Sequence, residues 1–225
     1  MATTMRLYTS NASPFCLKIM VLLRELGIGP SVVQLDYSVK AFPTSPTTAH
    51  SHLAPLGKIP ALALGTTGPG DETVLFGSQV IAQYLVDGVQ GGRASQQALA
   101  RPGTVERFEA LTTEALADGI CEAALALRYE RLERPAELVW PEWVSGQLSK
   151  ITRSVPVLSR RVATRIDPRA EVLPLDGIAA AIALYYVDRR APDANWRALE
   201  GGRELEEWYR AVQLRDSWRE TPFVQ

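Results

Sequence analysis

The 225-residue sequence contains few cysteines and few histidines, with two of each. Cys16 and Cys121 are far apart in the sequence and do not suggest a disulfide scaffold. A reduced, cytoplasmic protein is the simplest interpretation. An excess of charge of one sign is also lacking, because 24 Lys and Arg face 25 Asp and Glu, for a formal net charge of −1. We therefore expect no field that would recruit nucleic acid or an anionic membrane.

Long hydrophobic runs are absent as well. The first ten residues, MATTMRLYTS, have no apolar region of the kind found in secretory signals. The run GIAAAIALYYV at 177–187 is about half of the roughly 20 residues that a bilayer span requires. His50 and His52 form an H-x-H pattern, but no further ligand lies nearby, so we expect no metal site.

The first part of the chain alternates between β-type and helical segments. Residues 14–26 have apolar side chains at helical spacing, with Ser13 as a suitable N-cap, Pro14 at the first helical position and Gly27 at the end. The turn at 65–72 separates two strands, so its glycines suit a hairpin and not a phosphate cradle. The predicted order is β-α-β-loop-β-β-α, with strands at 5–9, 31–37, 58–64 and 73–76 and helices at 14–26 and 78–86.

The second part of the chain has a different pattern. A Gly-rich polar stretch at 87–96 is typical of a linker, and the sequence beyond it is almost entirely helical in spacing. The segment at 175–190 is so apolar that it should form a buried central helix. The predicted fold class is therefore α/β for residues 1–87 and all-α for residues 98–225. The predicted helices of the second part lie at 104–132, 142–165, 175–190 and 202–216.

Three segments of the first part and two of the second resemble the glutathione transferase family. SPFCLKIMVLLRELGI (13–28) is similar to the first helix of its serine-type and cysteine-type branches, and APLGKIPAL (54–62) to its loop ending in Val/Ile-Pro. LFGSQVIAQYL (75–85) is similar to its acidic-Ser helix start, and the segments at 129–151 and 196–218 resemble bacterial and fungal members. The resemblance implies the glutathione transferase architecture, a thioredoxin-like glutathione-binding domain followed by a helical domain that contributes the acceptor pocket. It also implies glutathione as co-substrate, a homodimer and a role in detoxification.

Ser13 is the candidate catalytic residue. Glutathione reacts as its thiolate, and a thiol of pKa about 8.5 is only roughly 3% ionised at pH 7. A hydroxyl at a helix N-cap can donate to the sulfur, where the helix dipole also favours negative charge. One such bond contributes about 1.5–3 kcal/mol, which lowers the thiol pKa by roughly 1–2 units. The alternative is that Ser13 only caps the helix.

Cys16 occupies the third helical position. In the thioredoxin-like pattern this is the resolving cysteine, and Ser13 stands where the more reactive thiol would be. The interpretation we favour is a small buried hydrophobic residue. A nucleophilic Cys16 that carries out thiol-disulfide exchange is the alternative.

The resemblance assigns the remaining glutathione contacts. It implies a cis bond before Pro60, which would present the backbone of Ile59 to the cysteinyl part of glutathione like an added strand. Ser78 would cap the next helix and hold the γ-glutamyl carboxylate with nearby amides. The glutathione-binding residues implied in this way are Ser13, Phe15, Lys58, Ile59, Pro60, Gly77 and Ser78.

Several positions depart from the family pattern. Gly77 stands where Glu or Asp usually helps to neutralise the γ-glutamyl ammonium, so the sequence lacks one of the contacts that the family makes with glutathione. Ala54 replaces a common Asn. In the central helix, Pro174 and Gly177 replace the usual Ser/Thr cap and its Asp partner, and Asp176 is a partial substitute.

The acceptor is expected to be a hydrophobic electrophilic small molecule. By family position its pocket would lie between the domains and draw on residues 8–13 and the helix around 117–129. Tyr8, Phe15 and Tyr129 are aromatic candidates there, although each suits a core position equally. The leading hypothesis is conjugation of glutathione to this molecule. The alternatives are a glutathione-dependent double-bond isomerase and a non-catalytic ligand-binding or interaction protein.

Overall fold

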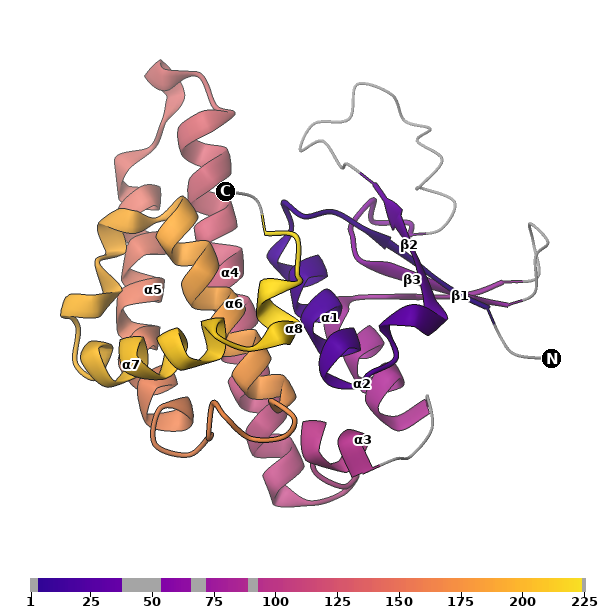
Figure 1. Cartoon of the computed structure of the whole chain (residues 1–225). Helices are drawn as coiled ribbons and strands as arrows, with labels where there is room; N and C mark the ends of the chain where they lie inside the picture. The colour runs from indigo at the N-terminus through magenta and orange to yellow at the C-terminus, as the bar shows by residue number, and fades with distance from the viewer. Residues whose placement is uncertain (1–3, 38–53, 66–71, 89–92, 224–225) are drawn as a thin grey trace. The chain divides into compact units, whose positions relative to one another are not determined.

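The computed structural model describes residues 4–37, 54–65, 72–88 and 93–223 (Figure 1). The chain forms two compact units, one of residues 1–98 with 220–225 and the other of residues 99–219. His50 and His52 lie outside the described residues. No described helix combines the length and the apolar character needed to cross a membrane.

The first unit is built on a mixed four-stranded sheet of order β2-β1-β3-β4. Strand β1 (Thr4–Thr9) pairs in parallel with β2 (Val32–Asp36) and antiparallel with β3 (Ala61–Gly65), which pairs antiparallel with β4 (Thr73–Phe76). Helices α1 (Pro14–Glu25) and α2 (Ser78–Gly88) pack against each other beside the sheet (Figure 1). The predicted order of strands and helices and the fold class are confirmed.

Helix α1 has a defined beginning and end. Ser13 is its N-cap and Pro14 its first residue, where the missing amide proton of proline removes no helical bond. At the other end Gly27 has a φ of +67°, which favours glycine, and the Ile28 amide donates to the Leu23 carbonyl at 3.0 Å. These signals were predicted from the sequence and are confirmed. The helix buries Pro14, Cys16, Leu17, Lys18, Ile19, Met20, Val21, Leu22 and Leu23.

Three local predictions for this unit were wrong. The strand expected at 58–64 begins only at Ala61, because the turn and the proline before it interrupt the ladder. The segment expected as a linker at 87–96 overlaps a short helix, α3 (Arg93–Ala98). Ser78 does not cap α2 but is its first residue, since the Gly77 carbonyl accepts the first helical bond from the Ile81 amide at 3.0 Å.

The second unit is helical. Its helices are α4 (Val105–Leu132), α5 (Pro141–Val162), α6 (Leu175–Arg190), α7 (Gly202–Gln213) and α8 (Asp216–Arg219). Helix α6 packs against both α4 and α5, and nearly every side chain from Leu175 to Leu184 is buried. The predicted central helix is therefore confirmed. The helix expected at 202–216 ends at Gln213, with α8 as a separate turn.

The start of α6 lacks a conventional cap. Pro174 is at the N-cap position and makes no side-chain capping bond, whereas the Asp176 carboxylate accepts from the Gly177 amide at 3.1 Å. Burial raises the pKa of Asp176, and that amide bond acts in the opposite direction. Asp176 therefore substitutes only in part for the cap that the sequence lacks.

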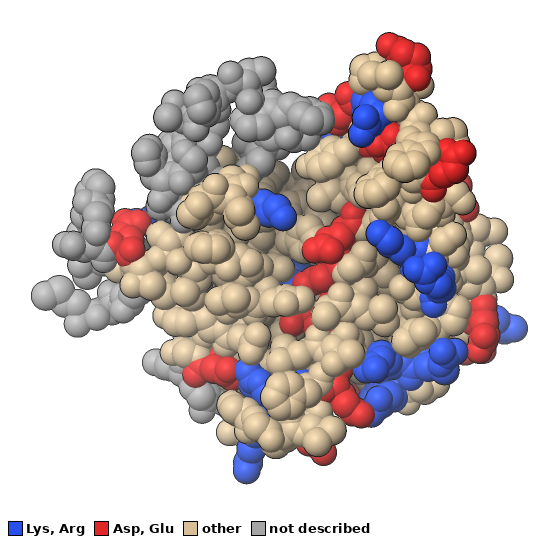
Figure 2. All heavy atoms as spheres, turned by 180° about the vertical axis from the view of Figure 1, so that it is seen from behind, with Lys and Arg blue, Asp and Glu red and all other residues tan. Residues whose placement is uncertain are grey.

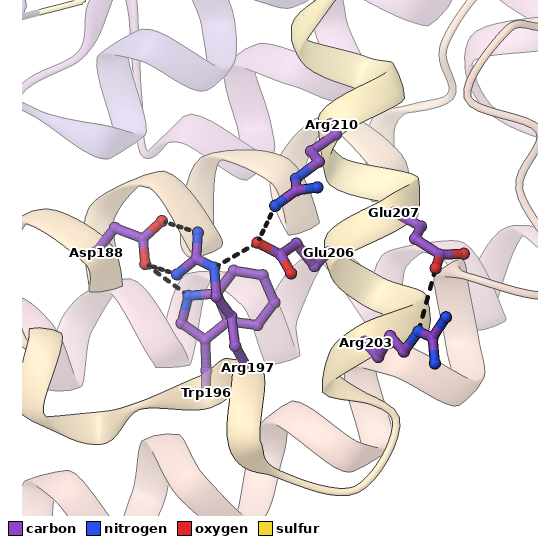
Figure 3. A network of polar contacts seen from close by, with 7 residues as sticks. All are labelled: Asp188, Trp196, Arg197, Arg203, Glu206, Glu207 and Arg210. Carbon is purple, nitrogen blue, oxygen red and sulfur yellow. Dashed lines mark hydrogen bonds and ion pairs between the residues drawn. The ribbon is translucent and has the colours of Figure 1, made fainter.

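A polar network joins the end of α6 to α7 (Figure 3). The Asp188 carboxylate accepts from the Trp196 indole at 2.7 Å and from two nitrogens of Arg197 at 2.6 and 2.8 Å. Arg197 also donates to Glu206 at 2.9 Å, and its guanidinium lies 4.2 Å from the centre of the Trp196 ring. The network fixes the connection between α6 and α7, which includes η4 (Pro192–Ala194) and η5 (Trp196–Ala198).

Candidate functional site

The strand register brings the candidate segments to one edge of the sheet. Tyr8 is opposite Ala61, and Ala61 is in turn opposite Phe76. The end of β1, the start of β3 and the end of β4 therefore lie side by side. Three segments adjoin these strand ends. The loop to Ser13 follows β1, the Ile59–Pro60 segment precedes β3, and the Gly77–Ser78 segment follows β4. Residues distant in sequence thus meet because of the sheet topology.

Ser13 is held at the positive end of α1. Its hydroxyl oxygen accepts from the Cys16 amide at 3.4 Å, and its amide donates to the Ser10 carbonyl at 3.2 Å. Its carbonyl accepts the first helical bond, from Leu17 at 3.0 Å. No acidic residue lies in the first turn of α1. The helix dipole can therefore act on an anion beside Ser13 without a competing carboxylate in that turn.

Cys16 lies behind Ser13 in the interior. Its side chain has 0% exposure, and burial raises the pKa of the thiol. Interactions with the Ser13 side chain, the Ser10 backbone and the Thr9 side chain act in the opposite direction but do not reverse it. A thiol in this environment is a poor nucleophile at neutral pH. This favours the structural interpretation of Cys16 over thiol-disulfide exchange.

Sequence reasoning did not single out Thr9 and Ser10. Thr9 is 3% exposed, and its hydroxyl has no hydrogen-bond partner of regular geometry among the described residues, although it lies near the Cys16 sulfur. Ser10 holds the turn into α1, because its hydroxyl oxygen accepts from the Ala12 amide at 3.3 Å. The only sequence signal for either residue was its place in the segment 8–13, which family position assigned to the acceptor pocket.

The segment before β3 has an irregular backbone. The peptide bond between Ile59 and Pro60 is cis, as the resemblance implied. Gly57 has a φ of +60°, and its amide donates to the Ala54 carbonyl at 2.8 Å, which closes the turn. Pro60 is buried, Ile59 is half-buried and Lys58 is exposed. Of these side chains, Lys58 is therefore the one most open to a solvent-borne ligand.

The start of α2 provides a second helix N-terminus at the same sheet edge. Gly77 has a φ of +87°, a conformation that favours glycine, and it is exposed. Ser78 is 7% exposed, and the first turn of α2 has no acidic side chain. A ligand carboxylate here would be favoured by the helix dipole, but Gly77 offers no carboxylate for a ligand ammonium.

The three aromatic candidates, Tyr8, Phe15 and Tyr129, belong to different units of the chain. Tyr8 and Phe15 are half-buried, and the Tyr8 ring meets Tyr37 edge-on at 6.5 Å. Tyr129 belongs to α4 in the second unit and is 36% exposed. Figure 2 shows that acidic and basic side chains are interspersed on one face, with uncharged surface between the groups. Across the described ranges, no group of three or more His, Cys, Asp or Glu side chains is arranged to hold a metal ion.

Comparison with known proteins gives a consistent result. The sequence profile of the glutathione S-transferase N-terminal domain matches residues 12–87. The chain is 30% identical over 192 residues to the uncharacterized GST-like protein YibF of Escherichia coli K12, and the match covers 85% of this chain and 86% of that protein.

Solved structures of similar chains extend this result. A glutathione transferase family member from Pseudomonas fluorescens Pf-5, solved with bound glutathione, is 33% identical. It superposes with a TM-score of 0.81 over 98% of this chain and 100% of its own. A glutathione S-transferase from Methylobacillus flagellatus KT with glutathione bound is 26% identical, with a TM-score of 0.77 over 98% of this chain and 100% of its own.

Proposed function

Because the chain belongs to the glutathione transferase family, we propose that it activates the thiol of glutathione with the Ser13 hydroxyl for addition to an electrophilic small molecule. The observation that carries the proposal is the position of Ser13. Its hydroxyl lies at the N-terminus of α1, at the same sheet edge as Pro60 and Ser78. A ligand that contacts all three segments would present its thiol to a hydroxyl and a helix dipole together.

The proposed activation requires no ionisation of Ser13. The hydroxyl oxygen accepts from the Cys16 amide and retains its proton for donation to a thiolate. A hydrogen bond to a charged group contributes about 1.5–3 kcal/mol, enough to lower a thiol pKa by roughly 1–2 units. A substantial fraction of bound glutathione would then be ionised at neutral pH. Cys16, which is buried and has a raised pKa, takes no part in this step.

The remaining contacts are proposed from the same geometry. The backbone of Ile59 would pair with the cysteinyl part of glutathione, with Pro60 setting its direction. The N-terminus of α2, at Gly77 and Ser78, would receive the γ-glutamyl carboxylate. Lys58, which is exposed, and Phe15, which is half-buried, would complete the contacts.

The ligand bound to one relative supports a proposal for the class of acceptor. The Pseudomonas relative, which in this complex is 32% identical, was solved with S-(propanoic acid)-glutathione. One route to such a conjugate is attack of the thiolate on the β-carbon of an α,β-unsaturated acid, in which a C–S bond is made and a solvent proton is added at the α-carbon. We propose this reaction class, an addition with no leaving group, for the present chain.

Gly77 favours a second candidate, a non-catalytic member of the family. Without a carboxylate at this position, the γ-glutamyl ammonium would lose one charged partner, which typically contributes about 1.5–3 kcal/mol. Calorimetric titration with glutathione distinguishes the proposed enzyme from the non-catalytic candidate. The enzyme proposal expects saturable binding at or below millimolar concentration together with glutathione-dependent consumption of an acrylate-type electrophile. Absence of heat and of competition at millimolar glutathione would exclude the enzyme and leave the non-catalytic candidate.

We also propose that the protein is a homodimer. β4 is an edge strand of the sheet, and Phe76 at its end is 45% exposed. Val80, in the first turn of α2, is 52% exposed, and β4 and α2 contact each other. Apolar side chains exposed beside a sheet edge are typical of an interface. Light scattering of the purified protein tests the proposal, and a Phe76→Glu variant should shift the mass to that of a monomer.

A further inference from the structure

The connection between α4 and α5 carries a group of exposed apolar side chains. It extends beyond the other helices of the helical unit (Figure 1), and we call its residues 131–143 the α4–α5 tip. Leu132 is 67% exposed, Leu138 60%, Trp140 59% and Trp143 43%. Single exposed apolar residues are common on protein surfaces, whereas a group of them typically marks an interaction site.

The backbone places three of these side chains on one surface. Val139 and Trp140 have extended conformations, in which successive side chains point to opposite sides. Val139 is half-buried, so its neighbours Leu138 and Trp140 share the outward side. Trp143 adjoins Trp140 across the first turn of α5, because residues three apart are neighbours on a helix.

Glu130 fixes the shape of the α4–α5 tip. It is 6% exposed, and its carboxylate accepts from the Trp140 amide at 2.9 Å and from Nε of Arg134 at 2.8 Å. The Leu138 amide donates to the Pro135 carbonyl at 2.9 Å. The apolar surface is therefore presented on a backbone that needs little further ordering to bind a partner.

The charges of the α4–α5 tip are unevenly compensated. Its two arginines each pair with a carboxylate of the helical unit, at 2.7 and 2.8 Å. Of its three glutamates, Glu133 pairs with Arg128 at 2.9 Å. Glu137 and Glu142 are exposed, and no basic side chain of the described ranges forms an ion pair with either. The uncompensated charge beside the apolar surface is therefore negative.

We propose that the α4–α5 tip is a docking surface for a protein segment that combines apolar side chains with Lys or Arg. Burial of Leu138, Trp140 and Trp143 supplies the apolar contact, and cations of the partner compensate Glu137 and Glu142. Tryptophan is also the residue type most enriched at the energetic centre of protein interfaces.

The tryptophans of the α4–α5 tip suit the same partner. The face of an indole ring attracts cations, and Lys150 Nζ already lies 5.9 Å from the centre of the Trp143 ring. The Trp140 ring is open to a cation from outside the chain, since 59% of this residue is exposed.

The uncompensated carboxylates favour a basic protein segment over two other occupants. Contact between the tips of two copies about a twofold axis would bring Glu137 and Glu142 of both copies together, and like charges oppose such contact. An anionic lipid surface would repel them in the same way. The docking surface lies wholly in the helical unit and requires neither bound glutathione nor the proposed transferase activity.

The probe is a synthetic peptide of about 15 residues, made of leucine and lysine with leucine at helical spacing. Trp140 and Trp143 are exposed, whereas Trp196, Trp208 and Trp218 are buried, so acrylamide quenching of tryptophan fluorescence reports the α4–α5 tip. We expect the peptide to protect the full-length protein from quenching saturably, and a matched leucine–glutamate peptide to give no protection. Absence of saturable protection, or equal protection by both peptides, would overturn the proposal.

The same fluorescence measurement distinguishes the other occupants. Dilution of the protein without peptide tests contact between copies, and vesicles of phosphatidylcholine with or without phosphatidylserine test a lipid surface. We expect quenching to be independent of protein concentration and of vesicles. Protection by a second copy or by vesicles as strong as that by the leucine–lysine peptide would contradict the assignment to a basic protein segment.

A pair of leucine variants tests the position of the docking surface. Leu138→Ala should weaken peptide binding about fivefold or more, because it removes apolar area that the partner would cover. Leu214→Ala is the matched control, since Leu214 is 62% exposed in the same unit but outside the α4–α5 tip. Both side chains are exposed, so neither substitution should unfold the protein, which circular dichroism checks. Unchanged binding in Leu138→Ala, or equal loss in both variants, would contradict the position.

Glutamate variants test the charge of the partner. Glu137→Gln combined with Glu142→Gln should weaken binding of the leucine–lysine peptide and reduce the dependence of that binding on salt. Glu204→Gln is the control, because Glu204 is also exposed, in α7, and no described basic side chain forms an ion pair with it. Peptide binding that is equally sensitive to salt in the wild type and the double variant would show that these two carboxylates do not attract the partner.

Discussion

The hydroxyl oxygen of Ser13 accepts a hydrogen bond from the backbone amide of Cys16 at 3.4 Å. This contact uses a lone pair of the oxygen and leaves the hydroxyl proton for donation. The side chain can therefore cap the helix and donate to an incoming thiolate at the same time. Helix capping and the proposed catalytic role, which the sequence presents as alternatives, are compatible in one residue.

We expect Ser13→Ala to lower kcat/KM for glutathione conjugation by about tenfold to a hundredfold, because a hydrogen bond to a charged group contributes about 1.5–3 kcal/mol. The apparent pKa of bound glutathione, measured from the pH dependence of the rate, should rise by roughly 1–2 units. Ser13→Thr keeps a hydroxyl and a capping oxygen and serves as the control. Identical pH profiles in wild type and Ser13→Ala would remove Ser13 from the mechanism.

The thiols of the native protein should be unreactive. Cys16 is 0% exposed and Cys121 is 2% exposed, and burial raises the pKa of Cys16. Because alkylation proceeds through the thiolate, we expect iodoacetamide to label both slowly at pH 7 and rapidly in urea. Mass spectrometry of the labelled peptides measures each site. Cys16→Ala should retain transferase activity, whereas rapid native labelling of Cys16 would support the thiol-exchange alternative.

Local signals in the sequence predicted the ends of several helices. Ser13 with Pro14, and Gly27 at the other end, marked α1, and continuous apolar character marked α6. Helix α2 was predicted with the wrong cap, because serine is a common N-cap whereas here the Gly77 carbonyl occupies that role. The preference for serine is statistical, and the positive φ of Gly77 is a property of the chain's path that a propensity does not encode.

The sequence predicted the separate segments of the candidate site but not that they lie together. Sequence motifs identified Ser13, Pro60 and Ser78, but only the register between Tyr8, Ala61 and Phe76 shows that these segments meet. Strand register depends on pairing over long sequence distances, which a single sequence does not specify.

Asp188 should contribute more to stability than an exposed acid on α7. Its carboxylate accepts hydrogen bonds from both Trp196 and Arg197 (Figure 3), and the donor–acceptor distances are 2.6 to 2.8 Å. We expect Asp188→Asn to lower the free energy of unfolding by about 1–3 kcal/mol, since its bonds to Arg197 are charge-assisted. Glu207→Gln is the control, because Glu207 pairs with Arg203 at 3.4 Å with both side chains exposed. Its effect should stay within about 0.5 kcal/mol.

Urea unfolding followed by tryptophan fluorescence measures this difference. All five tryptophans lie between residues 140 and 218, so the signal reports the helical unit. Equal effects of the Asp188 and Glu207 substitutions would show that the network contributes no more than a surface ion pair.

Stability of the helical unit should decrease in acid. The Trp140 amide lowers the pKa of Glu130, and the Arg131 and Arg197 side chains lower those of Asp193 and Glu206. Each of these carboxyl groups stabilises the fold at pH values above its ordinary pKa, which is 4.5 for Glu and 3.8 for Asp. That stabilisation is lost as the pH falls through the pKa of the group in the folded protein.

Asp176 has the opposite sign, because burial raises its pKa and its contribution grows as the pH falls. Three carboxyl groups have a lowered pKa and one has a raised pKa. We therefore expect the free energy of unfolding to fall as the pH drops below about 5. Asp193→Asn should reduce this pH dependence. An unfolding free energy that is constant from pH 6 to pH 3 would contradict the prediction.

Gly202 should tolerate no side chain, unlike two other helical glycines. A Cβ at Gly202 would lie 2.6 Å from the carbonyl oxygens of both Trp196 and Arg197, which are backbone atoms fixed by the Asp188 network. We expect Gly202→Ala to lower the free energy of unfolding by about 1–3 kcal/mol. At Gly119 and Gly146, inside α4 and α5, an added Cβ meets nothing within 4 Å.

The substitutions Gly119→Ala and Gly146→Ala should therefore stabilise the protein by about 0.5–1 kcal/mol, because alanine has less conformational freedom to lose in a helix. Urea unfolding of the three variants under one condition compares them directly. The chemical change is identical in each, so a difference in sign between Gly202 and the two controls isolates the close approach of the backbone. A neutral or stabilising Gly202→Ala would mean that the turn between η5 and α7 can move away from the added methyl group.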